Sequence, residues 1–208
     1  MKTIADVSGH VNRPVEGDRP RRADAQRSFD ALLLAAKAVF AISGVDAPVR
    51  DIADRAGVGL GTLYRHFPQR SDLIVAVFRH EIDACADEAP ALARTYAPFE
   101  ALARWMQRCA DFFVTKRGLA TALHSGDPAY EALPVYFEQR FEPTLRAMLA
   151  AAAASGEVRA HVDAFDLLRA VGNLCMSARD DCTDHARRMV MLLVNGLRQE
   201  NQLFPYQP

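Results

Sequence analysis

The stretch VRDIADRAGVGLGTLYRHFPQRSDL, from Val49 to Leu73, decides the fold of this chain. Ile52, Ala53 and Ala56 recur at helical spacing, which predicts a short helix with one buried face. Gly57 follows directly, and glycine adopts a positive φ without steric cost. A second short helix comes after this turn. The stretch therefore predicts two helices joined by a glycine turn, a helix-turn-helix.

The second of these helices is expected to bury one side and expose the other. The residues predicted to pack inward recur at steps of three and four: Leu60, Leu63, Tyr64 and Phe67. The residues predicted to face outward are small, polar or basic: Gly59, Thr62, Arg65 and His66. Such a face, after a glycine turn, is typical of a helix that enters the DNA major groove.

The run IADRAGVGLGTLYRHFPQRSDL, residues 52–73, resembles the TetR family of transcriptional regulators. The matching features are the Ala-Gly-Val turn, Gly-Thr-Leu-Tyr, His-Phe, a basic residue at Arg70, and Leu73. The resemblance implies an all-α, nine-helix fold. In that fold an N-terminal helix-turn-helix domain of three helices binds DNA, and a C-terminal helical domain binds ligand and dimerises.

DNA contacts are expected from both helices of the motif. Thr62 offers a hydroxyl and a methyl to base edges, and Arg65 suits a guanine or a phosphate. By resemblance, Tyr64, His66 and Arg70 contact phosphates. The full expected set is Arg50, Gly59, Leu60, Thr62, Tyr64, Arg65, His66 and Arg70. Two alternatives stay open: a surface histidine that bridges neighbours at position 66, and a half-buried aromatic without a DNA bond at position 64.

Three domains are expected along the chain. They are a disordered arm over residues 1–22, a DNA-binding domain over 23–70, and a ligand-binding and dimerisation domain over 71–208. No strand pattern is visible. The expected helices cover residues 23–42, 48–56, 59–67, 71–87, 99–117, 119–124, 129–154, 164–178 and 181–201. A break between helices is expected between Pro90 and Pro98, and kinks are expected at Pro134 and Pro143.

The C-terminal domain carries an aromatic wall that predicts a sensor for a small, largely apolar effector. By resemblance, its helices frame a ligand cavity, although stripes of this kind are also typical of a simple core. The expected ligand-binding residues are Trp105, Cys109, Phe112, Phe113, His124, Tyr136, Phe137, Arg140 and Phe141. Among them His124, Tyr136 and Arg140 are the polar groups expected to orient the ligand.

The last two helices are expected to form a homodimer. Each has an apolar face, and in the family these helices pair across a two-fold axis. The expected interface residues are Leu168, Val171, Leu174, Val190, Leu193, Val194 and Leu197. Gly172 and Gly196 are expected to allow close backbone approach. Two recognition helices about 34–36 Å apart then meet successive major grooves.

Composition agrees with this interpretation. Residues 1–70 hold 11 Lys/Arg and 8 Asp/Glu, a net charge of +3, whereas residues 71–208 hold 14 and 18, a net of −4. The four cysteines lie apart, at Cys85, Cys109, Cys175 and Cys182, without a CxxC pair, as expected for free thiols in a cytoplasmic protein. Cys182 is the candidate for an exposed thiol. No signal peptide, membrane span, metal site or cofactor is expected.

The predicted function is a DNA-binding transcriptional regulator and not an enzyme, since no nucleophile elbow, P-loop or HExxH motif is present. It is expected to repress by binding a palindromic operator as a homodimer and to be released by its effector. The alternative is an activator, or a ligand-binding protein of the same fold with weakened DNA binding. Gly59 hints at the latter, because the family often has a serine there.

Overall fold

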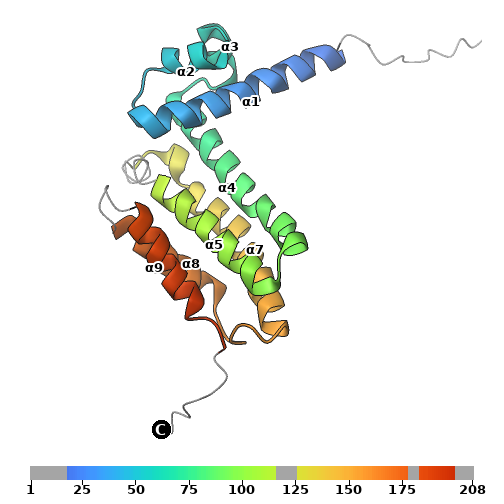
Figure 1. Ribbon diagram of the computed structural model, residues 1–208. Coiled ribbons are helices and arrows are strands. Elements are labelled where there is room, and N and C mark those ends of the chain that lie inside the picture. Colours follow the sequence, from blue (N-terminus) through green and yellow to red (C-terminus); the bar gives the residue numbers. More distant parts are fainter. Residues whose placement is uncertain (1–17, 116–125, 178–182, 200–208) are drawn as a thin grey trace, which may run out of the picture.

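The chain folds into two stacked groups of helices, with α1, α2 and α3 at one end (Figure 1). This computed structural model describes residues 18–115, 126–177 and 183–199. Within these ranges the regular elements are helices, together with one isolated antiparallel bridge between Val158 and Arg198. The predicted all-α class is confirmed. In chain order the elements are α1 (Asp18–Ser43), α2 (Val49–Ala56), α3 (Leu60–His66), α4 (Arg70–Thr95), α5 (Pro98–Thr115), a 3₁₀ turn η1 (Pro128–Tyr130), α7 (Leu133–Ala154), α8 (Ala164–Ser177) and α9 (Thr183–Asn195).

Helices α1, α2 and α3 form a small domain, here called the reading head. Leu32 and Ala36 of α1 are fully buried against Ile52 of α2 and Leu63 of α3. Leu73 of α4 completes this core. Helices α2 and α3, with 8 and 7 residues, are too short to be stable alone, so the shared buried apolar core holds them against α1.

The N-terminal end of α1 differs from the prediction. The helix begins at Asp18 rather than at residue 23, so residues 18–22 of the predicted disordered arm are helical. Pro20 is tolerated because the N–H groups of the first turn need no helical partner. The rest of the predicted arm, residues 1–17, lies outside the described residues.

Helix α4 links the reading head to the remaining helices, here called the body. It runs to Thr95 with Pro90 inside it, so the predicted end near residue 87 is wrong. Pro90 is exposed, so its ring lies on the outer face of α4 and away from the core. The helix ends at Thr95 and Tyr96 adopts an extended conformation, so the break falls between Pro90 and Pro98, as predicted. On the reading-head side, the buried Glu81 carboxylate pairs with Lys37 of α1 at 2.8 Å.

The body is built around α5, which packs against α4, α7, α8 and α9. Its core contains Trp105, Met106 and Cys109, all completely buried. Figure 1 shows α8 and α9 on the side of the body away from α4. Their inner faces therefore close the core, while their outer faces are open to solvent in one protomer.

Other boundaries move by a few residues. Pro48 is the N-cap of α2 and not its first residue, and neither it nor Ala47 provides a side-chain cap. Pro134 lies in the first turn of α7, and Pro143 lies within that continuous helix. α9 ends at Asn195, not at residue 201, because Arg159 N–H binds the Leu197 carbonyl and Gln199 N–H binds the Glu157 carbonyl. The predicted helix over 119–124 lies outside the described residues.

Candidate nucleic-acid interface and regulatory core

The turn between α2 and α3 sets the angle of the two helices. Gly57 has φ 68° and ψ 29°, the left-handed conformation that glycine adopts freely. Its N–H and that of Val58 bind carbonyls in the last turn of α2, with Val58 N 3.0 Å from the Ala53 oxygen. This end of α2 is thereby satisfied without a longer loop, as the sequence predicted.

The exposed face of α3 is centred on Gly61 and Arg65, which lie one turn apart. Tyr64 lies beside them with half of its surface exposed. Thr62 is half-buried on the other flank, and Gly59 is exposed just before the helix. Arg50 of α2 is exposed as well. The surface available to a partner is therefore narrow, basic and nearly flat at its centre.

Two residues occupy other positions than the sequence indicated. Tyr64 was predicted to pack inward and is 50% exposed, whereas Leu63 and Phe67 are buried. His66 was predicted to face outward, yet its ring lies edge-on to Phe29 of α1 at 5.9 Å. The reason is the 100° step of an α-helix: with Leu63 and Phe67 at the centre of the buried side, Tyr64 falls at its margin. His66 thus bridges neighbours, one of the alternatives left open.

Sequence reasoning missed Gly61 as a surface residue. A Cβ at this position would meet no atom within 4 Å, apart from its chain neighbours and the backbone of its own helix. The same is true of Gly59. Glycine inside a helix is destabilising by about 0.5–1 kcal/mol relative to alanine, and packing within this chain does not require it. The signal that identifies Gly61 is its four-residue spacing from Arg65.

Arg70 makes contacts within the protein. Its guanidinium donates to the carbonyls of Val45 and Ala47, the latter at 2.6 Å. These carbonyls belong to the loop between α1 and α2, so Arg70 fastens that loop to the first turn of α4. Gln69 and Asp72 form a capping box at the same point, with Gln69 N 2.9 Å from the Asp72 carboxylate. Arg70 therefore braces the reading head whether or not it meets a phosphate.

The aromatic residues predicted to line a ligand cavity are packed together as core. Phe141 is completely buried, with its ring centroid 4.3 Å from that of Phe137 and 5.4 Å from that of Trp105. Trp105 Nε1 donates to the Cys85 carbonyl at 2.8 Å. Of the remaining predicted wall, Cys109 and Phe112 are buried and Phe113 is half-buried.

The buried thiols have the character of core residues. Cys85, Cys109 and Cys175 are fully buried thiols that form no disulfide with one another. Burial raises the pKa of the Cys109 thiol well above its usual value, and the neighbouring Cys85, with its sulfur 4.0 Å away, adds to the rise. A thiol with a raised pKa is poorly nucleophilic at neutral pH. Cys182 lies outside the described residues.

Tyr136 and Arg140 are directed at α4. The Tyr136 hydroxyl oxygen lies 2.7 and 2.8 Å from the two carboxylate oxygens of Asp83. Arg140 donates to Asp83 at 2.7 Å and to Asp87 at 2.6 Å. Burial and the hydrogen bond to Asp83 raise the pKa of the Tyr136 phenol, which keeps it a donor at neutral pH. We call these four residues the α4–α7 latch. His124, the third predicted polar ligand group, lies outside the described residues.

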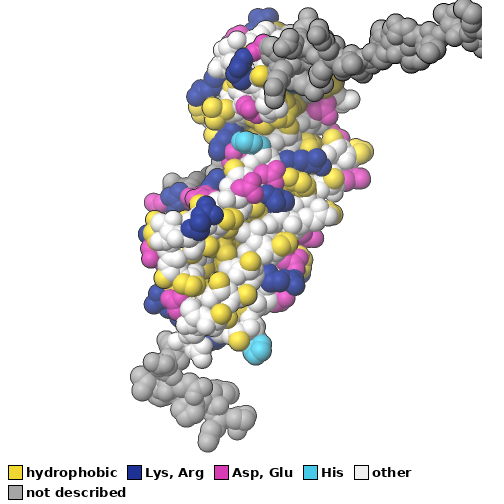
Figure 2. All heavy atoms as spheres, turned by 90° about the vertical axis from the view of Figure 1, so that its right-hand side faces the viewer, with side chains coloured by type: hydrophobic (Ala, Val, Ile, Leu, Met, Phe, Trp, Pro, Cys, Tyr) yellow, Lys and Arg dark blue, Asp and Glu magenta, His cyan; other side chains and the backbone are white. Residues whose placement is uncertain are grey.

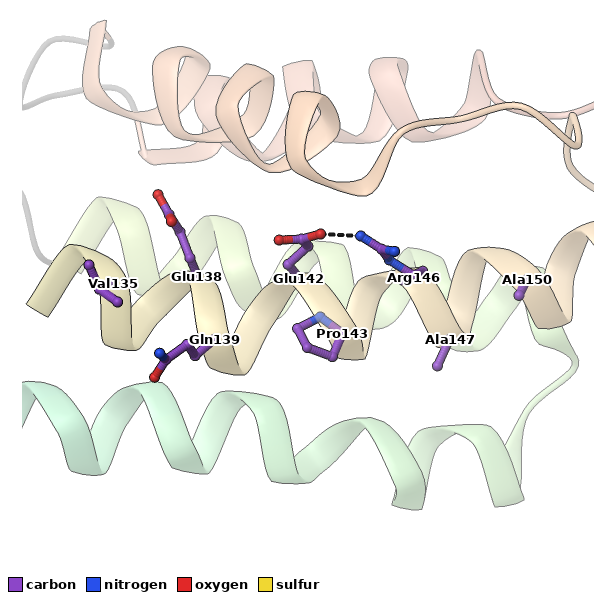
Figure 3. Close-up of a pocket in the computed structure, with 8 residues that line it drawn as sticks. All are labelled: Val135, Glu138, Gln139, Glu142, Pro143, Arg146, Ala147 and Ala150. Carbon is purple, nitrogen blue, oxygen red and sulfur yellow. Dashed lines mark hydrogen bonds and ion pairs between the residues drawn. The ribbon is translucent and has the colours of Figure 1, made fainter.

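A groove of about 570 Å³ lies along the outer face of α7 (Figure 3). Glu142 and Arg146 pair along its edge, and Pro143 and Ala147 form part of its surface. None of the predicted ligand-binding residues within the described ranges lines it. Within the described residues, no three His, Cys, Asp or Glu side chains are grouped to hold a metal ion, and none of the described helices is long and apolar enough to cross a membrane.

The apolar faces assigned to the dimer are largely the protomer's own core. Leu168, Val171, Val190 and Val194 are buried within the protomer with at most 3% of their surface exposed, and their place in an interface stays a prediction. Leu174, Leu193 and Leu197 are half-buried. Gly172 faces inward, since a Cβ there would meet the Phe113 ring at 3.7 Å. The outer face of α9 instead presents Leu192, which is 64% exposed.

Comparison with known proteins gives a consistent result over both parts of the chain. The family model described as bacterial regulatory proteins, tetR family, matches residues 32–77. The model for the C-terminal domain of SbtR-like transcriptional regulators matches residues 97–199. A TetR transcriptional regulator from Streptomyces coelicolor is 38% identical with a TM-score of 0.70, and the match covers 81% of this chain and 97% of that one.

Two further relatives extend the comparison. A TetR regulatory protein from Mycobacterium vanbaalenii is 36% identical with a TM-score of 0.68, over 86% of this chain and all of that chain. The HTH-type transcriptional repressor KstR from Mycobacterium tuberculosis is 37% identical over 91 residues. That match spans 42% of this chain and 37% of KstR.

Proposed function

Because this chain belongs to the TetR family and is a DNA-binding transcriptional regulator, not an enzyme, we propose that it represses transcription as a homodimer on a palindromic operator. A small effector bound in the body then releases it. The name of KstR, a repressor, supports the direction of control. The observation that carries the proposal is the exposed face of α3, with Gly61 and Arg65 at its centre and Tyr64 beside them.

The residues of this face divide the work between position and specificity. Arg65 is long enough to form two hydrogen bonds with a guanine, and Tyr64 presents its hydroxyl to a phosphate. Gly61 has no side chain, so the backbone of α3 approaches the groove closely. Arg50 of α2 adds a second basic contact. His66 and Arg70 act first by bracing the head, through Phe29 and the loop carbonyls respectively, and the phosphate roles expected of them remain part of the proposal.

Replacing Arg65 tests the assignment directly. In Arg65→Ala, affinity for an operator selected from a random DNA library should fall by about 1–3 kcal/mol, roughly 5- to 150-fold.

Gly61→Ala should raise the free energy of unfolding by about 0.5–1 kcal/mol while weakening DNA binding. Fluorescence anisotropy and urea denaturation measure the two quantities.

The matched control is Arg94→Ala, at the far end of α4, where an exposed arginine is lost without touching the reading head. It should leave affinity unchanged. If Arg65→Ala and Arg94→Ala bound the selected operator equally well, α3 would not be the reading helix. If the unchanged chain selected no DNA, the alternative of a ligand-binding protein with weakened DNA binding would replace the proposal.

Effector release requires the body to act on the reading head, and α4 makes both contacts. On one side Glu81 pairs with Lys37 of α1, and Arg70 holds the loop before α2. On the other side the α4–α7 latch joins Asp83 and Asp87 to α7, beside Phe137 and Phe141. A ligand that separates α7 from α5 would pull on the latch and tilt α4. Coupling of about 1–3 kcal/mol is typical of such linkage.

Breaking the latch tests this step without the effector. Tyr136→Phe removes one hydrogen bond to Asp83, worth about 0.5–1.5 kcal/mol. Operator affinity of the ligand-free protein should drop by about 2- to 10-fold. Glu142→Gln is the control, because it breaks an ion pair confined to α7. If the Tyr136→Phe variant and the unchanged protein bound the operator equally well, the latch would have no influence on DNA binding.

A further inference from the structure

A second cleft lies where the reading head meets α4. It has a volume of about 640 Å³ and is bounded by α1, α3, α4 and the η1 turn. Its floor is apolar and partly aromatic, and its rim is charged. None of the residues expected to bind effector from the sequence lines it. The lining residues are Phe29, Leu33, His66, Phe67, Asp72, Val75, Ala76, Arg79, His80, Asp83 and Ala129.

The two carboxylates of the rim are already engaged. Asp72 accepts the Gln69 N–H in the capping box of α4. Asp83 accepts from Tyr136 and Arg140 in the latch. Both negative charges are therefore balanced, one by the positive end of a helix and the other by a guanidinium.

The basic groups of the rim are in a different situation. Among the residues that the structure describes, Arg79 and His80 form no ion pair, and both are exposed. Arg79 lies over the Tyr136 ring, with its guanidinium carbon 4.9 Å from the centroid, which orients it beside the cleft. Figure 2 shows histidine, basic and acidic side chains gathered on this face, where the reading head joins the body. Arg79 and His80 are thus left as N–H donors for a ligand.

We propose that this cleft binds an aromatic carboxylate. The ring lies against Phe29, Leu33 and Phe67, and the carboxylate meets Arg79 and His80 at the rim. A flat apolar body suits a floor of aromatic and aliphatic side chains, and a guanidinium binds a carboxylate through paired hydrogen bonds. This site is separate from the aromatic core between α5 and α7, so it goes beyond the effector site of the proposed function.

The position of the cleft means that a bound ligand contacts both the reading head and α4. Phe29 and Phe67 belong to the reading head, whereas Arg79 and His80 lie further along α4 toward the body. A ligand held by both groups resists any change in the angle between the head and α4. The ligand therefore changes operator affinity if it binds more tightly to one angle between the head and α4 than to another. The size of the change is set by that difference in ligand affinity. This consequence rests on the proposed function; the binding itself does not.

Calorimetry of the full-length protein with 2-naphthoate tests the binding, with the neutral 2-naphthamide as a matched probe. We expect one saturable site per chain, at which the acid binds at least about tenfold more tightly than the amide. Arg79→Gln should remove most of this preference, and Arg94→Gln, on the same helix outside the cleft, should not. Ala129→Trp should block the site, whereas Ala132→Trp, an exposed neighbour outside the lining, should leave it open.

Alanine-methyl NMR locates the ligand independently of DNA. The signals of Ala76 and Ala129, which line the cleft, should shift on titration with 2-naphthoate. Those of Ala147 and Ala150, on the α7 groove, should not. The proposal is overturned by the absence of saturable binding, by equal affinity for acid and amide, by shifts confined to the α7 groove, or by full affinity in Arg79→Gln. Each result stands whether or not the chain binds an operator.

Discussion

Leu192→Arg is expected to convert the proposed homodimer into a monomer and to weaken operator binding by about 10²- to 10⁴-fold. Leu192 is 64% exposed on the outer face of α9, where a partner would cover it. A charge buried there without a counter-charge opposes association. The loss for DNA is large because a dimer binds its second half-site as an intramolecular event. Light scattering gives the mass, and anisotropy gives the affinity.

The outer face of α7 provides the control. Val135 is 53% exposed, comparable to Leu192, but lies on another side of the body. Val135→Arg should remain dimeric and should keep its operator affinity. A dimeric Leu192→Arg at micromolar concentration would place the interface elsewhere than on α9. In that event the spacing of the two reading heads would have to be set by other surfaces.

Phe141→Ala is expected to lower the free energy of unfolding by about 3–5 kcal/mol. Phe141 is completely buried, and its ring packs against Phe137 at 4.3 Å, Trp105 at 5.4 Å and Phe112 at 5.5 Å. Removing it leaves a cavity between α5 and α7 that the rigid neighbouring rings fill only in part. Guanidinium denaturation measures the change.

Tyr64→Ala is the comparison for Phe141→Ala, because it removes an aromatic side chain from the surface and not from the core. Tyr64 is half-exposed on the reading head, so its removal should change the free energy of unfolding by no more than about 0.5 kcal/mol. It should nevertheless weaken operator binding. A cost below about 1 kcal/mol for Phe141→Ala would show that Phe141 lines an empty space rather than a packed core. Together the two variants distinguish the effect of a residue in the packed core from that of a residue on the exposed face of α3.

The helix-turn-helix was predictable because its determinants are local. Gly57 occupies the left-handed position that the turn requires, and Ile52 and Leu63 recur at a spacing that only a helix buries on one side. The same local information misplaced Tyr64 and His66. In a helix of seven residues, hydrophobicity alone does not decide which side of the buried stripe a borderline aromatic occupies. The packing of Phe29 against His66 does.

The polar residues of the site could not be placed from the sequence. Tyr136 and Arg140 were expected to point at a ligand, and they bind Asp83 and Asp87, more than 50 positions earlier in the chain. Arg70 was expected at a phosphate, and it holds two loop carbonyls. Long polar side chains choose partners by distance in space, which periodicity does not encode.

From the amino-acid order alone came the all-helical class, the glycine turn, the family resemblance and the identity of the apolar faces. These follow from the period of an α-helix and from backbone preferences within a few residues. What covers each apolar face came from the three-dimensional arrangement. Leu168 and Val190 close the protomer's own core, while Leu192 stays exposed on α9. The reason is physical: burial is a property of two surfaces that meet, and a sequence pattern describes only one of them.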